Sequence, residues 1–175
     1  LDRITSISTK VNLEHHHYRV LRKAVFMSAY QTIVVGTDGS KSSLLAVERA
    51  ASIAAAFDAT LVIGCAYYEN QEAASSTLRQ DSVQVLGDDR AQQNLATAME
   101  AAAGAGATKV ETEVKAGSPV EALMALVNDH NADLLVVGNR GINSLTGRLL
   151  GSVPSDVARK SDCDVMIVHT VTDAS

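Results

Sequence analysis

Aromatic residues, proline and cysteine are all scarce in this chain. Phe, Trp and Tyr together make up 3% of its 175 residues, Trp is absent, and there are only two prolines and two cysteines. A core with so few aromatic rings must be built from Val, Leu, Ile and Ala, which favours helices packed on a buried parallel sheet. The same shortage argues against a flavin protein, because few rings are available to stack on the isoalloxazine system.

Long apolar runs and clustered positive charge are also missing. No run approaches about 18 apolar residues, so the sequence predicts no membrane-spanning helix and no membrane partner. The net charge of −5 is uneven: residues 1–26 carry five Lys or Arg and two acids, whereas residues 27–175 carry ten basic and eighteen acidic residues. Affinity for a phosphate backbone depends on clustered Lys and Arg, so we expect no nucleic-acid partner.

The two cysteines, Cys65 and Cys163, lie far apart in apolar surroundings. They form no C-x-x-C motif and have no His spacing typical of zinc ligands, so we assign no metal site and interpret both as packed thiols. Two unpaired cysteines fit a reducing compartment, and we expect the protein to be cytoplasmic.

The first 26 residues differ from the rest of the chain. They contain a His-His-His run and show no sustained hydrophobic period, and their charges interrupt any signal-peptide core. We interpret residues 1–26 as a leader or purification tag outside the fold. Residues 27–175, starting at Met27, are then expected to form a single domain.

Short β-branched runs alternate with longer Ala- and Leu-rich segments after Met27, which indicates repeated βα units. This pattern predicts an α/β fold: a doubly wound, open, five-stranded parallel sheet in the order 3-2-1-4-5, with helices on both faces. Strands are expected at 32–36, 60–66, 109–115, 133–138 and 164–168, and helices at about 42–57, 83–103 and 119–129 and from about 153.

Details of the pattern refine this prediction. Ser118 followed by Pro119 and Glu121 predicts a capped helix start. The strand at 109–115 alternates apolar and charged residues and should lie at an edge. The strands at 133–138 and 164–168 are apolar on both faces, so we expect them to be interior or covered.

Ligands of such sheets bind beyond the carboxyl ends of the strands, where the strand order reverses. Two carboxyl ends are rich in glycine and small polar residues, Gly36-Thr37-Asp38-Gly39-Ser40 and Gly138-Asn139-Arg140-Gly141. The predicted order makes them neighbours. Two roles are open for Asp38: it could contact a ligand, or it could cap the following helix, which Ser40 can do more directly.

The second of these segments opens a longer glycine motif. Gly138, Gly141, Gly151 and Ser152 follow the spacing G-x2-G-x9-G-S, and the last two precede a predicted helix. Glycines let backbone N–H groups line a concave anion site, and the start of a helix favours a phosphate through its unpaired N–H groups and its dipole. Such a site needs no basic side chain, so an acidic chain can hold phosphate.

This spacing resembles the nucleotide-binding motif of the universal stress protein family, and the V-G-T-D-G-S opening of the first strand is also similar to that family. The likeness extends from Met27 to Val168. It implies the family's fold, an adenine nucleotide ligand and a homodimer through the last strand. Two positions depart from the usual pattern: Asp164 stands where the family often has proline, and Pro154 follows the motif.

The resemblance also implies roles for particular residues. The motif glycines and Ser152 would hold phosphate and ribose, Asp38 would lie near the ribose or adenine, and Ala66 would contact adenine through its backbone. The candidate nucleotide-binding residues are Gly36, Thr37, Asp38, Ala66, Gly138, Asn139, Arg140, Gly141, Gly151, Ser152 and Val153.

Two functions remain open. The first is a non-enzymatic sensor or sequestering module in the stress response that binds cyclic AMP or ATP. The second is a slow Mg²⁺-dependent ATPase or phosphotransferase using the same site. The sequence offers no evident acid pair for Mg²⁺ and no Walker lysine, which favours the first function and a ligand with one phosphate charge. We therefore assign no catalytic residue and expect Mg²⁺ only with ATP.

A phosphoacceptor receiver domain has the predicted fold class, but this chain lacks the residues that such a domain requires. It requires an Asp after the third strand and a Lys after the fifth, where this chain has Lys115-Ala116-Gly117 and His169-Thr170.

Overall fold

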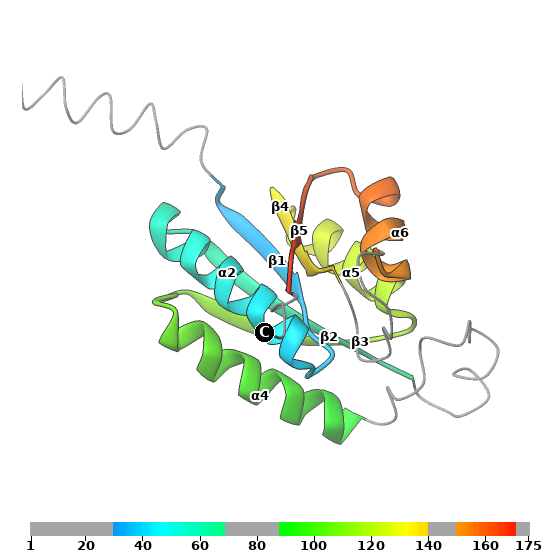
Figure 1. Ribbon diagram of the computed structural model, residues 1–175, viewed down its shortest axis with the longest axis horizontal. Helices are drawn as coiled ribbons and strands as arrows, with labels where there is room; N and C mark the ends of the chain where they lie inside the picture. The colour runs from blue at the N-terminus through cyan, green and yellow to red at the C-terminus, as the bar shows by residue number, and fades with distance from the viewer. Residues whose placement is uncertain (1–29, 69–87, 140–149, 171–175) are drawn as a thin grey trace, which may run out of the picture.

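The computed structural model describes residues 30–68, 88–139 and 150–170 (Figure 1). The expected leader, the part of the second expected helix before residue 88, and the candidate residues Arg140 and Gly141 lie outside the described residues.

Strands and helices alternate along the described chain, as predicted. The elements are β1 Thr32–Gly36, α2 Lys41–Phe57, β2 Thr60–Tyr67, α4 Asp88–Gly104, β3 Val110–Ala116, α5 Pro119–Asp129, β4 Leu134–Gly138, α6 Ser152–Lys160 and β5 Asp164–Val168. The predicted bounds that fall within the described residues differ from these by one residue at most.

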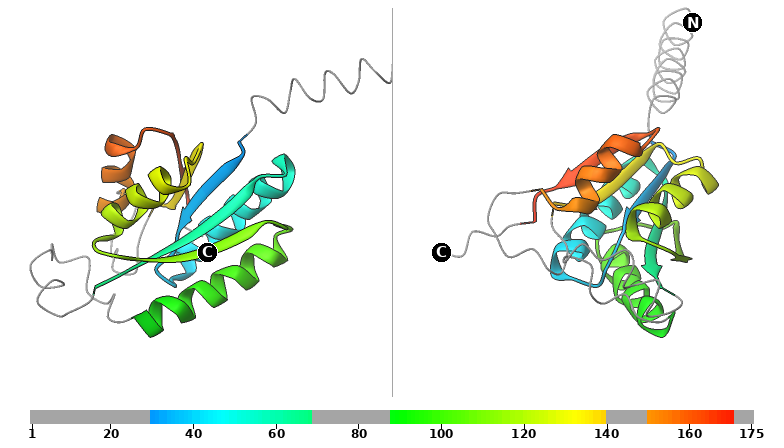
Figure 2. Two further views of the ribbon diagram at one scale, coloured as in Figure 1. Left: turned by 180° about the vertical axis from the view of Figure 1, so that it is seen from behind. Right: turned by 90° about the vertical axis from the view of Figure 1, so that its right-hand side faces the viewer.

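The five strands form one parallel sheet in the order β3-β2-β1-β4-β5, which confirms the predicted topology. Helices α2 and α4 cover one face, and α5 and α6 cover the other (Figure 2). The alternation along β1 shows why two layers form: Ile33 and Val35 belong to the core under α2 and α4, whereas Val34 belongs to the core under α5 and α6.

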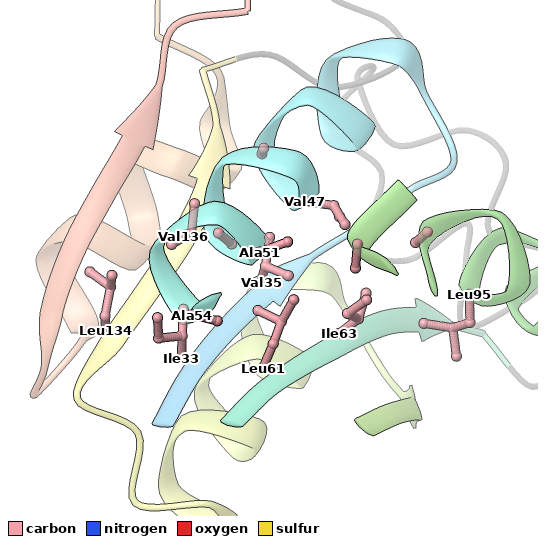
Figure 3. Close-up of a cluster of buried hydrophobic side chains, with 14 of the residues drawn as sticks. Ile33, Val35, Val47, Ala51, Ala54, Leu61, Ile63, Leu95, Leu134 and Val136 are labelled. Atoms are coloured by element: carbon pink, nitrogen blue, oxygen red, sulfur yellow. The ribbon is translucent and has the colours of Figure 1, made fainter. Parts of the chain in front are cut away.

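The larger core consists of branched side chains from the strands packed against alanines of α2 (Figure 3). Leu61 and Ile63 on β2 are fully buried, as are Ala51 on α2 and Val136 on β4. Burying one such branched side chain contributes roughly 1.5–3 kcal/mol, and the small alanines let α2 lie close to the sheet. This rigid layer fixes the positions of the strand ends.

The two edges of the sheet are formed by different kinds of strand. On β3, Val110 and Val114 pack against the α2 and α4 core while Glu111 is exposed. Together with its place at the end of the strand order, this confirms the predicted edge strand. β4 is buried as expected. The prediction that the strand at 164–168 would be interior or covered is wrong for the single chain: among the described strands β5 pairs only with β4, and its Ile167 is 36% exposed.

Candidate functional site

The strand order reverses between β1 and β4, which pair in parallel with Val35 opposite Val136. The segments that follow these strands therefore leave the sheet side by side at its carboxyl edge. This places the turn after Gly36 next to the Gly138-Asn139 end of β4, as the sequence predicted. Ala66 lies near the end of β2, the strand paired with β1 on its other side.

The turn between β1 and α2 is held by its own polar groups. The buried Thr37 hydroxyl lies 3.1 Å from the Ser43 hydroxyl and accepts from the N–H of Gly39, whose φ is +78°. Ser40 is the N-cap of α2, since its hydroxyl accepts from the Ser43 N–H at 3.1 Å. Asp38 is therefore not the cap, and its carboxylate accepts from the Ser40 N–H at 3.0 Å.

Helix α6 begins at the same edge without a side-chain cap. Its N-cap is Gly151, whose N–H donates to the Asn139 carbonyl at 3.0 Å, so the helix start is fixed to the end of β4. Ser152 is exposed in the first turn, and Val153 is half-buried. Helix starts leave N–H groups unpaired and carry partial positive charge, so this geometry suits an anion.

Glycine at position 151 is not required by the protein's own packing. Its φ is −65°, which any residue adopts, and an added Cβ would lie 3.5 Å from the Asn139 carbonyl oxygen and from Pro154, which is ordinary contact. The fold would therefore accept a side chain here. The glycine instead leaves the helix start open to close approach by a ligand.

Asn139 is a buried polar residue at the centre of this edge, 7% exposed. Its side-chain oxygen accepts from the N–H and the hydroxyl of Thr170, at 2.9 and 2.7 Å. Its own N–H donates to the Val168 carbonyl at the end of β5. The sequence reasoning missed Thr170, because no local pattern links two residues 31 positions apart.

A thiol and an amide lie beside the β1–α2 turn. Burial raises the pKa of Cys65 to about 11; a hydrogen bond from Asn94 opposes this shift, and the negative charge of Asp38 adds to it. The thiol is thus protonated at neutral pH, which supports its interpretation as a packed group. Asn94, on α4, was also missed: a Cβ added at Gly39 would lie 2.2 Å from its side-chain oxygen.

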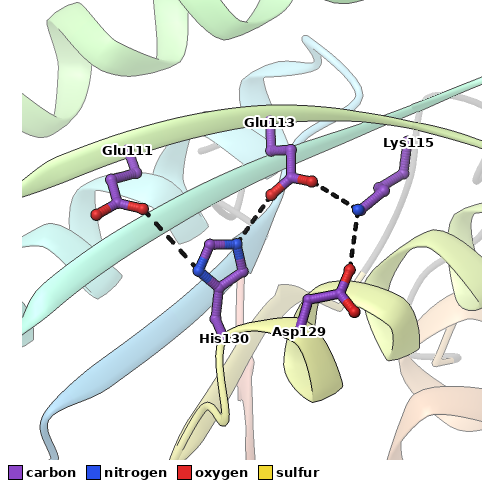
Figure 4. A network of polar contacts seen from close by, with 5 residues as sticks. All are labelled: Glu111, Glu113, Lys115, Asp129 and His130. Carbon is purple, nitrogen blue, oxygen red and sulfur yellow. Dashed lines mark hydrogen bonds and ion pairs between the residues drawn. The ribbon is translucent and has the colours of Figure 1, made fainter.

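A separate polar network lies over β3 and the C-terminal end of α5 (Figure 4). His130, the C-cap of α5, places Nε2 2.8 Å from Glu113, and Lys115 bridges Glu113 and Asp129 at 2.6 and 2.9 Å. Hydrogen bonds from His130 and then Lys115 lower the pKa of Glu113. His130 directly follows the last residue of α5, and its ring contacts Glu111 and Glu113 of β3, so this network joins the end of α5 to the edge strand.

Two features are absent from the described residues. These residues contain no group of three or more His, Cys, Asp or Glu that could hold a metal ion. Within the same residues, no helix combines the length and apolar character needed to cross a bilayer.

Comparison with known proteins assigns the chain to a family. The model of the Universal stress protein family matches residues 29–169. The chain belongs to the universal stress protein family. It is 51% identical over 146 residues to the universal stress protein Rv1636 of Mycobacterium tuberculosis, which covers 82% of this chain and 99% of that protein.

Solved structures of similar proteins support the same family assignment. A crystal structure of a universal stress protein in complex with cAMP is 47% identical, with a TM-score of 0.66, and the match covers 82% of this chain and 100% of that one. The universal stress protein UspA from Lactobacillus plantarum has the same TM-score at 23% identity, covering 81% of this chain and 99% of that one, and it shows the shared fold. Family and fold are thus as the sequence predicted, while the roles of individual residues stay predictions.

Proposed function

We propose that this protein binds an adenine nucleotide, cyclic AMP or ATP, at the carboxyl edge between β1 and β4, and acts as a sensor or sequestering module. The observation that carries the proposal is the start of α6: Gly151 opens the helix without a side-chain cap and is bonded to Asn139 at the point where the strand order reverses. The 47% identical relative in complex with cAMP supports an adenine nucleotide as ligand.

The phosphate would lie over the first turn of α6. The N–H groups of Ser152 and Val153 lie in that turn, the exposed Ser152 hydroxyl adds a donor, and Pro154 supplies none. Gly138 lies at the other end of the motif, at the close of β4. Arg140 and Gly141, outside the described residues, complete the predicted set.

The adenosine half of the ligand would lie over β1 and β2. The Asp38 carboxylate can accept from a ribose hydroxyl, and it follows β1 in a turn that Thr37 and Ser43 hold. Near the end of β2, backbone groups around Ala66 can meet the edge of adenine. Gly36, opposite Gly64 of β2, is where α5 packs closely on the strand end, since an added Cβ would lie 2.9 Å from the Leu123 side chain.

Charge favours cyclic AMP over ATP as the ligand. Residues 27–175 carry eighteen acidic and ten basic residues, so a triphosphate would meet net repulsion unless a cation accompanied it. Cyclic AMP carries one negative charge, which the N–H groups and dipole of a helix start can balance. ATP would bring Mg²⁺ with it, and the protein's role is binding rather than turnover.

Calorimetric titration of the full chain with cyclic AMP, Mg-ATP and cyclic GMP tests the proposal. We expect saturable binding of cyclic AMP, tighter than that of Mg-ATP, and weaker binding of cyclic GMP. If the titrations show no binding of any adenine nucleotide, the proposal is contradicted. Phosphate release from bound ATP, measured in parallel, would instead support the ATPase. A chain beginning at Met27 should bind equally well, because we place residues 1–26 outside the fold.

We also propose a cytoplasmic homodimer through β5. This edge strand exposes Ile167, and an edge of unpaired backbone groups with an apolar side chain favours pairing with a second copy. Light scattering after gel filtration should give twice the chain mass. Ile167→Lys should give monomers, whereas a wild-type monomer at micromolar concentration would contradict the proposal.

A further inference from the structure

A chain of hydrogen bonds between one buried and two half-buried polar residues joins the two halves of the proposed site. It runs from Ser42, in the first turn of α2, to Thr170, two residues beyond β5, and on to Asn139, directly after β4. The Ser42 and Thr170 hydroxyls are hydrogen-bonded, and the Asn139 side-chain oxygen accepts from Thr170 N–H at 2.9 Å and from its hydroxyl at 2.7 Å.

The chemistry of the donors fixes the direction of this chain. A backbone N–H can only donate, so the atom of Asn139 that faces the Thr170 N–H must be its oxygen. That oxygen can only accept, so the Thr170 hydroxyl gives its proton to it. The remaining lone pairs of that hydroxyl then accept from Ser42. Each link thus has a defined donor, which makes the arrangement specific.

Both ends of this series of hydrogen bonds lie next to residues of the proposed site. Ser42 lies two residues after Ser40, the cap that closes the turn containing Asp38. Asn139 holds the Gly151 N–H through its carbonyl at 3.0 Å and so fixes the start of α6. Thr170 is bonded to both, although it lies outside the glycine motif and outside every strand and helix.

We propose that Thr170 is a positioning residue for the phosphate half of the site. It sets where Asn139 lies, and Asn139 in turn sets where the N–H groups of the α6 start point. This inference rests on the proposed function, since it concerns the affinity of the same site. Thr170 reaches the ligand only through Asn139, so its loss should weaken binding of the phosphate more than binding of the adenosine.

The test uses two substitutions at this position in the full chain. Thr170→Val removes the hydroxyl but keeps the shape and the backbone N–H that holds Asn139, so the protein should still fold. Thr170→Ser restores the hydroxyl. The matched control is Thr97→Val, because Thr97 is exposed on α4 and, among the described residues, its hydroxyl bonds only to the Gln93 carbonyl of its own helix.

Calorimetry with cyclic AMP and with adenosine gives the first measurement. Thr170→Val should weaken cyclic AMP binding about fivefold, the usual effect of one lost hydrogen bond, and change adenosine binding less than about twofold. Thr170→Ser and Thr97→Val should bind as the wild type does. Amide hydrogen exchange without ligand gives the second measurement: the Gly151 N–H should exchange faster in Thr170→Val only.

The outcomes separate this inference from the function it rests on. Wild-type protein that binds neither ligand would overturn the proposed function, and the positioning role with it. Wild-type binding that Thr170→Val leaves unchanged would overturn the positioning role alone. Equal losses for cyclic AMP and adenosine would overturn it too, because a general loss of structure has that effect.

Discussion

Helices α5 and α6 cover the same face of the sheet, yet they begin in opposite ways. At the start of α5, the Ser118 hydroxyl accepts from the Glu121 N–H, and the Glu121 carboxylate accepts from the Ser118 N–H and hydroxyl. Pro119 has no N–H to satisfy. The start of α6 has only Gly151 as its N-cap, without a side-chain hydrogen bond.

The difference shows where this protein builds stability and where it leaves room for a ligand. At the start of α5 the Glu121 carboxylate lies at the positive end of the helix, and the N–H groups of Ser118 and Glu121 donate to side chains of the cap. The α6 start lies at the carboxyl edge beside β4 and has no such carboxylate. An external phosphate would complete α6 in the way that Glu121 completes α5.

The largest effect is expected when α6 receives an acid of its own. Gly151→Asp would place a carboxylate where the phosphate is proposed to lie. We expect cyclic AMP affinity to fall at least about 100-fold, or about 2.7 kcal/mol, through repulsion and occupied N–H groups. Folding stability should hold or rise by a few tenths of a kcal/mol, because Asp is a better N-cap than Gly.

Calorimetry and urea unfolding would check both parts of this prediction. Gly104→Asp is the matched control, because it adds the same charge at the end of α4, where a new Cβ would meet nothing within 4 Å. It should bind like the wild type. Wild-type affinity in Gly151→Asp would show that the α6 start does not hold the phosphate.

The converse change removes the cap from α5. Ser118→Ala deletes the hydroxyl that accepts from Glu121 N–H, so the free energy of unfolding should fall by about 1 kcal/mol. Cyclic AMP affinity should fall much less than in Gly151→Asp, since α5 follows β3, which β2 and β1 separate from β4 and the proposed phosphate site. Urea unfolding and calorimetry separate the two effects. A loss of affinity that exceeds the loss of stability would mean that the α5 start belongs to the site.

The fold could be predicted from the sequence because its signals are local. Alternating apolar and charged residues predicted that β3 is an edge strand, and Ser118 with Pro119 predicted the start of α5. The exposure of β5 could not be predicted in the same way. Its apolar residues are typical of a buried strand, whereas the order 3-2-1-4-5, predicted from the fold class, leaves one side of β5 unpaired among the described strands.

The site was predictable only in part for the same reason. The spacing of the glycine motif indicated an open helix start, and Ser40 was recognised as a cap for α2. The contacts of Asn139 with Thr170, and of Asn94 with Cys65, join segments 31 and 29 residues apart. The first pair forms where two parallel strands end at one edge and the second where α4 packs on β2, and no pattern along the chain predicts either.

The smallest expected effect concerns the negative charge of Glu121 in the first turn of α5. Hydrogen bonds from the Ser118 hydroxyl and then its N–H lower the pKa of Glu121 below its ordinary value of 4.5. A lowered pKa in the folded state stabilises the protein above the unfolded pKa, and this contribution is lost as pH falls through the folded one. Since Glu121 is exposed, it should amount to only a few tenths of a kcal/mol.

Urea unfolding of Glu121→Gln between about pH 3 and pH 6 would measure this contribution. Glutamine keeps the acceptor but cannot titrate, so wild type should exceed the variant in stability above the ordinary glutamate pKa and lose that advantage in acid. Glu100→Gln, an exposed change on α4, should show no such convergence. If wild type and Glu121→Gln differ in free energy of unfolding by the same amount down to the lowest pH, then the hydrogen bonds of the cap, and not the charge of Glu121, stabilise the start of α5. The contrast with α6 would then rest on capping geometry alone.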